Sequence, residues 1–176
     1  PPIDLDLMEE ELAALLTDIA TGDFMAREVP AEARRLMDVA FSGNGEPTSA
    51  AEFPEAVARA TAVMRRLQLP GDVKLRLITN GSLLHRETVR DGIRRIGACD
   101  GEVWFKVDRA TGDGIAAVNK VPLDPERMRG NLETCAGLAP TWIQTCWFVF
   151  DGEAPSAAEE AAYLAFVGAV SQKIRG

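Results

Sequence analysis

Apolar residues recur along the chain with two different periods, and segments of one period alternate with segments of the other. Where they return every three or four residues, as Met8, Leu12 and Leu15 do, the pattern is typical of an amphipathic helix. Short, mostly apolar runs between these segments are typical of strands. The pattern predicts helices near 6–20, 53–67, 89–96, 128–138 and 156–173, and strands near 36–42, 73–79, 102–108 and 141–150.

Glycine and proline predict where some of these elements end. Pro70-Gly71 follows the second helix, and Gly97 stands where a C-terminal cap of the third helix is expected. The glycine-containing stretch 109–122 is interpreted as a loop between the third strand and the fourth helix. No linker or change of composition divides the chain, so residues 1–176 are expected to form one α/β domain.

The alternation of helices and strands predicts a parallel sheet with right-handed crossovers. Within the strands, one set of alternate positions is apolar, as at Val39, Leu75 and Val103, and the other set carries polar groups. Strands of an open doubly wound sheet are covered on both faces and tend to be apolar throughout. One apolar and one polar face instead favour a (β/α) barrel, with helices on one side and a polar, ligand-holding concavity on the other.

Composition narrows the class of protein. The chain has 47% hydrophobic and 26% charged residues, and it lacks an apolar run of the roughly 18 residues that a membrane span needs. It opens without a signal-peptide pattern. Its net charge of −8 comes mostly from residues 1–35, which hold nine acidic and three basic side chains. This acidity argues weakly against a nucleic-acid backbone as the main partner, without excluding it.

The three cysteines, Cys99, Cys135 and Cys146, are spaced unlike any zinc or cluster motif. Their odd number suits a reducing compartment, in which all three are expected to be small core residues. The cysteines and the absence of a targeting pattern together predict a cytoplasmic protein with no membrane partner.

Polar side chains gather where the strands are predicted to end. Glu46 closes the segment after the first strand, Asn80 follows the second, Lys106 and Asp108 end the third, and Gln144 lies in the fourth. The carboxyl ends of parallel strands meet at one edge, where such folds bind their ligands. Glu46 is suited to an ammonium, Lys106 to a carboxylate, and the others to sugar hydroxyls. The set predicts a zwitterionic, sugar-bearing small molecule as the ligand.

Two simpler interpretations compete with this one. Thr48 or Ser49 could cap the following helix, which would leave Glu46 as an exposed residue. The glycines before Glu46, which let the backbone approach a ligand closely, favour the binding interpretation. Lys106 and Asp108 could form only an ion pair that closes the barrel.

Four segments in order, SGNGEPT, TNGSLL, VWFKVD and VNKVP, resemble the radical S-adenosylmethionine superfamily. In that family the Gly-Glu-Pro turn holds the methionyl amino group, and later polar positions contact the rest of the cofactor. The resemblance implies a radical S-adenosylmethionine enzyme, which cleaves this cofactor reductively with a [4Fe–4S] cluster to start hydrogen abstraction from a substrate. The cofactor-binding residues that it implies are Ser42, Gly43, Asn44, Gly45, Glu46, Pro47, Asn80, Lys106, Asp108, Asn119 and Gln144.

The family's CxxxCxxC signature, which supplies the cluster ligands, is absent from the chain. The resemblance therefore implies a partial (β/α)6 TIM-like barrel whose first strand and cysteine loop lie upstream of Pro1. The chain alone is then expected to be inactive, and the complete enzyme would take electrons from a donor such as flavodoxin or ferredoxin. The alternative is a degenerate, cluster-free barrel that acts as a binding or interaction module. No motif identifies a substrate, and fold alone does not fix one.

Three further features have competing interpretations. Arg86, Arg90 and Arg94 form a basic stripe that a tRNA substrate of a wyosine-type radical enzyme could contact, and WIQTCWF faintly resembles that branch. Acidic residues between the arginines instead favour a solvated helix face. His85 is interpreted as a surface residue rather than an acid–base catalyst. Trp104 is suited equally to stacking on an adenine and to filling the core.

Overall fold

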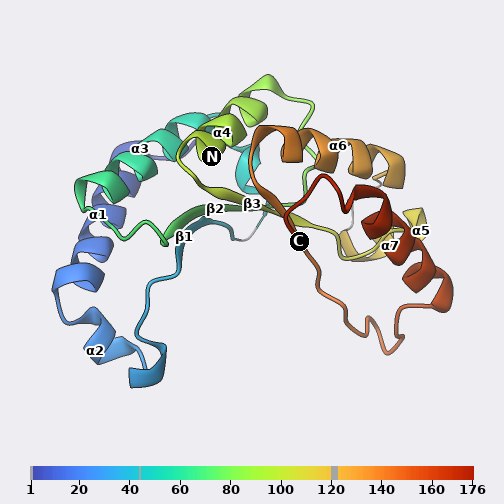
Figure 1. The fold of residues 1–176 in the computed structure, drawn as a ribbon, viewed down its shortest axis with the longest axis horizontal. Coiled ribbons are helices and arrows are strands. Elements are labelled where there is room, and N and C mark those ends of the chain that lie inside the picture. The colour runs from blue at the N-terminus through green and yellow to red at the C-terminus, as the bar shows by residue number, and fades with distance from the viewer. Residues whose placement is uncertain (1, 44, 120–122) are drawn as a thin grey trace.

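Four parallel strands form one sheet, and they lie side by side in the order in which they occur in the chain (Figure 1). The computed structural model describes residues 2–43, 45–119 and 123–176. The strands are β1 (Asp38–Phe41), β2 (Lys74–Thr79), β3 (Glu102–Lys106) and β4 (Thr141–Gln144). Each is preceded by a helix and parallel to its neighbour, so the predicted α/β class and the parallel sheet are confirmed.

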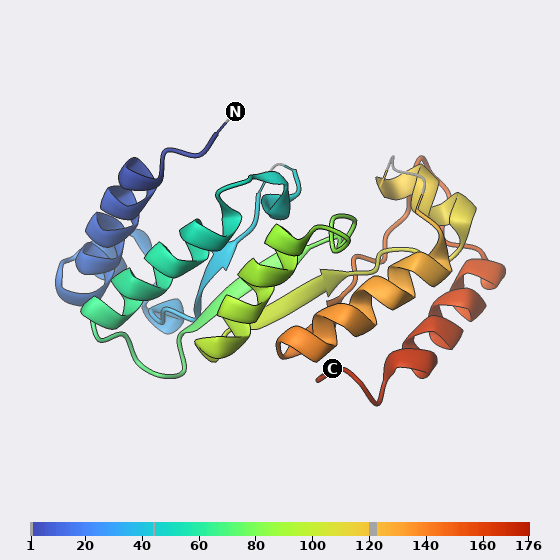
Figure 2. The same ribbon diagram turned by 90° about the horizontal axis from the view of Figure 1, so that it is seen from above.

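The long helices lie along one side of the sheet in chain order (Figures 1 and 2). They are α1 (Leu5–Thr21), α3 (Phe53–Arg66), α4 (Glu87–Ala98), α6 (Pro125–Leu138) and α7 (Ala157–Val170). These are the five helices that periodicity predicts. Two shorter helices, α2 (Phe24–Glu28) and α5 (Gly112–Asn119), and the 3-10 turns η1 (Ala31–Ala33) and η2 (Pro47–Ser49) were not predicted.

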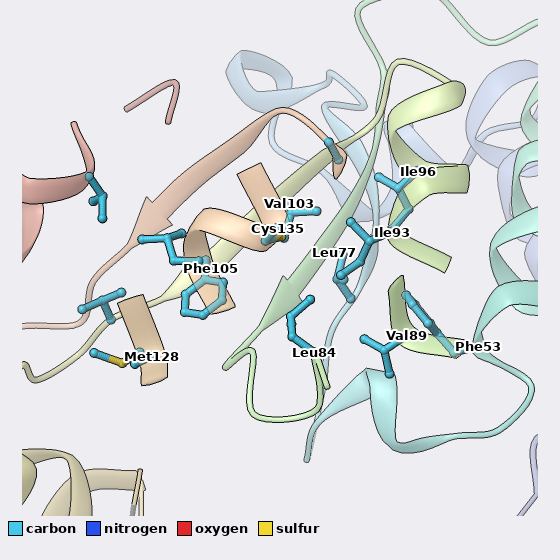
Figure 3. Close-up of a cluster of buried hydrophobic side chains, with 14 of the residues drawn as sticks. Phe53, Leu77, Leu84, Val89, Ile93, Ile96, Val103, Phe105, Met128 and Cys135 are labelled. Carbon is cyan, nitrogen blue, oxygen red and sulfur yellow. The ribbon is translucent and has the colours of Figure 1, made fainter. Parts of the chain in front are cut away.

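The core lies between the sheet and these helices. Leu77 lies beside Ile93 of α4, whereas Val103 and Phe105 lie on the side of Cys135 and Met128 of α6 (Figure 3). The three strand residues are fully buried. They belong to the alternate positions that the sequence marks as apolar, so the predicted division of the strands into two faces is confirmed. Burying one large apolar side chain stabilises a fold by about 1.5–3 kcal/mol. This face of the sheet therefore provides most of the fold's stability.

Helix α4 ends two residues later than Gly97 predicts. Cys99 is the C-cap, and the chain turns at Asp100, whose φ of +60° is in the left-handed region. Gly97 instead serves a packing role, because a Cβ at this position would lie 2.5 Å from the carbonyl oxygen of Leu138. The glycine therefore allows the close approach of α4 to the end of α6, and the predicted cap is wrong.

Two other boundaries differ from the prediction. The stretch 109–122 was expected to be a loop, but residues 112–119 form α5. Strand β4 was expected to reach residue 150 but ends at Gln144. The chain leaves the sheet there because Cys146 donates its backbone N–H to Asp108 and residues 150–153 close a tight turn. These long-range and turn contacts replace the strand pairing that the apolar run 147–150 predicts.

The last two residues lie against the outer edge of β4. The Arg175 N–H donates to the carbonyl of Thr141, and the Ile143 N–H donates to the carbonyl of Gly176, and both hydrogen bonds are 2.8 Å long. The ribbon in Figure 1 shows this end of the chain returning from α7 to the sheet. Among the described residues, no helix is both long enough and apolar enough to cross a bilayer.

Candidate ligand-binding site

A hollow of about 750 Å³ lies at the carboxyl ends of the strands. Its walls come from the segments after β1 and β2, the ends of β3 and β4, and the last turn of α5. Nine of the residues that sequence reasoning selects line it: Ser42, Gly43, Gly45, Glu46, Asn80, Lys106, Asp108, Asn119 and Gln144. Pro47 does not line it and begins η2, and Asn44 lies outside the described residues.

Glu46 is fixed by hydrogen bonds from two neighbouring segments. Its Oε1 accepts from the N–H and the hydroxyl of Thr48, at 3.2 and 2.6 Å, and from the hydroxyl of Thr79 at 2.6 Å. Its Oε2 accepts from the backbone N–H of Asn80 at 2.9 Å. The carboxylate therefore joins the segment after β1 to the end of β2, and it also lines the hollow.

The alternative reading of this segment is corrected in one respect. Neither Thr48 nor Ser49 caps the long helix, because α3 begins at Phe53 with Glu52 at its N-cap position. Thr48 is buried and donates to Glu46, which itself caps the short turn η2. Gly43 and Gly45 have φ angles of +144° and +119°, which other residues rarely adopt, so both glycines are needed for the backbone path that leads to Glu46.

The turn after β2 is equally constrained. The side-chain carbonyl of Asn80 accepts from the N–H of Ser82 at 2.9 Å, which closes a local turn. Gly81 has a φ of +69°, and a Cβ there would lie 2.2 Å from the ring of Phe105. The TNG sequence therefore sets a tight turn against the core, and that turn directs the Asn80 N–H toward Glu46.

Lys106 and Asp108 form an ion pair at the far wall of the hollow, with 3.5 Å between Nζ and Oδ2. Asp108 is almost entirely buried, and its Oδ1 accepts from the N–H of Cys146 at 2.9 Å. The two residues do form the ion pair that one interpretation predicts. Lys106 remains partly exposed to the hollow, so its ammonium can also meet a ligand anion.

The side-chain oxygen of Gln144 receives no hydrogen bond from any described residue. Gln144 lines the hollow, and its buried Oε1 has no hydrogen-bond partner among residues 2–43, 45–119 and 123–176. An unpaired buried acceptor costs about 1–3 kcal/mol, so a donor on a ligand would be favoured at this point. Asn119, at the end of α5, faces the same hollow.

Sequence reasoning selected Asp108 but missed the part that other buried polar groups play at this end of the fold. Of the six buried polar side chains among the described residues, Asp108 lines the hollow and Thr48 and Thr79 bond to Glu46. Arg109 and Glu159 line a second hollow that shares Val118 with this one. Glu159, in the first turn of α7, accepts from the backbone N–H groups of Ala110 and Thr111 and from the Thr111 hydroxyl. These groups stand just before α5, so Glu159 positions the helix that carries Asn119. In the sequence, Glu159 cannot be distinguished from an ordinary acidic residue in the first turn of a helix.

Arg109 holds the opposite wall. Its guanidinium donates to the carbonyl of Asp108 at 2.6 Å and to that of Phe148 at 3.0 Å. It also lies over the rings of Trp147 and Phe148, at 5.2 and 5.0 Å from their centroids. Phe148 lines the hollow, so this buried cation fixes the segment that follows β4.

Several other candidates lie away from the hollow. Trp104 neither lines it nor fills the core, because the guanidinium of Arg76 stacks on its ring at 4.6 Å. His85 is exposed and does not line the hollow. Arg90 and Arg94 both pair with Glu87 of their own helix, at 2.7 and 2.8 Å, and Arg86 is exposed just before the helix begins. The solvated-face interpretation of the basic stripe fits these pairs.

The cysteines occupy three separate places. Cys135 is buried in the core, where desolvation raises the pKa of its thiol to about 12. Cys99 is half-buried in a different hollow, whereas Cys146 is exposed and lines the candidate site. The prediction that all three are core residues is therefore wrong for Cys146. No group of three histidine, cysteine or acidic side chains suited to a metal occurs within the described part of the chain.

The chain is an α/β protein with a polar hollow at the carboxyl edge of a parallel sheet, the edge at which such folds place their binding residues. Comparison of the chain with protein-family models, curated proteins and solved structures gave no match. What the site does must therefore be argued from its geometry.

Proposed function

We propose that the hollow binds S-adenosylmethionine and that the chain forms the cofactor-binding part of a radical S-adenosylmethionine domain. The observation that carries the proposal is the convergence of nine candidate residues, from segments as far apart as Ser42 and Gln144, on one hollow. Their order along the chain is that of the family the sequence resembles. Their chemical types also suit an amino acid joined to a nucleoside.

The donor and acceptor groups of the hollow fit such a cofactor. Glu46 offers a carboxylate oxygen to an ammonium, and Lys106 offers a cation to a carboxylate. The unpartnered Oε1 of Gln144 suits a ribose hydroxyl, which is a hydrogen-bond donor. Ile78, Val118 and Phe148 add apolar surface to the same hollow, as a flat base requires.

The arrangement of the sheet supports the finer prediction of a partial (β/α)6 barrel. The strands curve beneath a single layer of helices (Figure 1). The hydrogen bonds of Arg175 and Gly176 to β4 extend the sheet at its last edge, as a following strand of a barrel would. Such a barrel would enclose the polar face of the strands, which explains why Arg76 and Lys106 lie on that face.

The cysteines of this chain do not fit a [4Fe–4S] cluster. Cys135 is buried in the core, and Cys99 and Cys146 line two different hollows, so they cannot ligate one cluster together. A radical enzyme would need its cluster thiolates, and an electron donor, from outside these residues. What this chain contributes is the binding and orientation of the cofactor. Three free thiols also suit a reducing cytoplasm.

The same observation favours a second candidate, a cluster-free module that binds the nucleoside–amino acid without cleaving it. Both candidates require the hollow to bind the cofactor, and they differ only in whether iron is present. The tRNA-modifying alternative gains little support from the basic stripe, because Arg90 and Arg94 both pair with Glu87 of their own helix, which offsets part of their charge.

Calorimetric titration of the purified chain with S-adenosylmethionine and with S-adenosylhomocysteine tests the shared requirement. We expect both to bind, and Glu46→Gln to weaken binding about tenfold or more, because the replacement removes the charge that faces the ammonium. Glu10→Gln, which makes the same change at an exposed position of α1, is the matched control. Absence of binding by the unaltered chain would overturn the proposal.

Iron and sulfide content, measured on the product of the complete gene purified without oxygen, then separates the two candidates. About four irons per chain supports the radical enzyme, whereas cofactor binding without iron, even after reconstitution, supports the cluster-free module.

A further inference from the structure

We propose that Thr79 and Thr48 are positioning residues that preset the Glu46 carboxylate as a site for a primary ammonium. The inference rests on the proposed function, since it concerns how the same hollow recognises the amino end of its ligand. Both threonines are about 1% exposed, and they reach Glu46 from different segments, the end of β2 and the turn η2.

The direction of the hydrogen bond from Thr79 follows from its second contact. Its Oγ1 accepts from the N–H of Gly81 at 3.0 Å, so its single hydroxyl proton is directed to Oε1 of Glu46, 2.6 Å away. Because the hydroxyl accepts one hydrogen bond and donates another, its proton has a single orientation. The turn at Gly81 fixes that orientation. Thr79 therefore transmits the geometry of the turn after β2 to the carboxylate.

The two oxygens of Glu46 are in unequal surroundings as a result. Oε1 accepts three hydrogen bonds, two from Thr48 and one from Thr79. From the residues that the structure describes, Oε2 accepts one, from the N–H of Asn80. A carboxylate oxygen can accept about two in good geometry, so Oε1 is saturated and Oε2 retains capacity for a further donor. The threonines thus orient the side chain so that Oε2 is the oxygen available to a ligand.

This arrangement selects for the chemistry of the ligand. A primary ammonium carries a positive charge and N–H donors, and a charge-assisted bond to a carboxylate that is already oriented needs no reorganisation of the protein. Without the Thr79 hydroxyl, Oε1 would lose a charge-assisted donor at a partly buried position, and the carboxylate would be held less firmly. The affinity for an amino-bearing ligand should then fall, whereas a ligand without an amino group should be unaffected.

Calorimetric titration with two probes tests this. S-adenosylhomocysteine carries the amino acid end, and 5′-methylthioadenosine has the same nucleoside and sulfur but no amino acid end. Thr79→Val, which removes the hydroxyl at nearly constant volume, is expected to weaken binding of S-adenosylhomocysteine about ten- to hundredfold and to change that of 5′-methylthioadenosine less than twofold. Thr79→Ser retains a hydroxyl and should restore most of the affinity. Thr48→Val and Thr48→Ser should behave in the same way.

The outcomes separate this inference from the proposed function. If the unaltered chain binds neither probe, the proposed function fails and the inference fails with it. If the unaltered chain binds S-adenosylhomocysteine and Thr79→Val binds it as tightly, only the inference is overturned. Equal loss of both probes in Thr79→Val, without recovery in Thr79→Ser, would mean that the threonine only holds the loop, and would also overturn it.

Discussion

The buried carboxylate of Asp108 accepts a hydrogen bond of 2.9 Å from the backbone N–H of Cys146. The two residues are far apart in the chain, and each lies just past the end of a neighbouring strand. This contact ends the pairing of β3 with β4 and turns the chain toward the hollow. The other oxygen of Asp108 pairs with Lys106. One carboxylate therefore shapes two walls of the candidate site.

Removal of this carboxylate should destabilise the fold. We expect Asp108→Ala to lower the free energy of unfolding by about 1–3 kcal/mol, because the Cys146 N–H loses its acceptor and the Lys106 ammonium loses its ion-pair partner. Asp108→Asn retains an acceptor and should cost about 1 kcal/mol less. Urea denaturation followed by circular dichroism measures both. Asp151→Asn, at an exposed turn, is the control, and equal stability of all three variants would contradict this role for Asp108.

Glu159 should be needed for the position of α5. In Glu159→Ala the N–H groups of Ala110 and Thr111 lose their acceptor, so the free energy of unfolding should fall by about 3 kcal/mol and amide exchange should quicken through residues 110–119. Glu159→Gln, which keeps one acceptor oxygen, should have a smaller effect. The neighbouring Glu160 is exposed, so Glu160→Gln should change neither quantity. Unchanged exchange in Glu159→Ala would show that α5 holds its place without this contact.

Arg109 should not be replaceable by lysine. The guanidinium donates to two carbonyls and lies over two aromatic rings, and an ammonium cannot match both contacts in one geometry. We expect Arg109→Lys to cost about 1–3 kcal/mol of stability and to alter the fluorescence of Trp147. Arg65→Lys at an exposed position of α3 provides the comparison. A wild-type emission spectrum in Arg109→Lys would argue against the stacked arrangement.

The three thiols should react with an alkylating reagent at different rates. Cys146 is exposed and should react first, Cys99 more slowly, and Cys135 only after unfolding. Peptide mapping by mass spectrometry assigns the sites. Under the proposed function, S-adenosylhomocysteine should protect Cys146 and leave Cys99 unaffected, because only Cys146 lines the candidate site. Protection of both thiols would indicate a general tightening of the fold instead.

Cys135 also makes stability depend on alkaline pH. Burial raises the pKa of its thiol from 9.0 to about 12, so the unfolded chain loses this proton at a lower pH than the folded chain does. The contribution is fully present below pH 9 and is lost as the pH rises toward 12. Compared with the wild type, Cys135→Ala should therefore show a shallower fall of unfolding free energy across this range. Parallel curves for the two proteins would contradict this.

Much of the fold could be predicted because its signals are local. The five long helices and the two faces of the strands follow from the spacing of apolar residues such as Leu75 and Leu77. The gathering of Glu46, Lys106 and Gln144 could also be predicted, since strand ends in a parallel sheet meet at one edge. All of these predictions can be made without knowing which residues are in contact in the folded protein.

The sequence by itself determined the α/β class, the parallel direction of the strands and the edge of the sheet at which polar groups collect. Only the tertiary structure decided where β4 ends, that Gly97 packs on α6 rather than capping α4, and which buried groups hold the hollow. The Glu159 carboxylate meets Ala110 across 49 positions, and Thr79 meets Glu46 across 33. The spacing of apolar residues and the preference of each residue for helix or strand are properties of a few neighbouring positions. A buried polar group, by contrast, is satisfied by whatever the whole fold brings beside it.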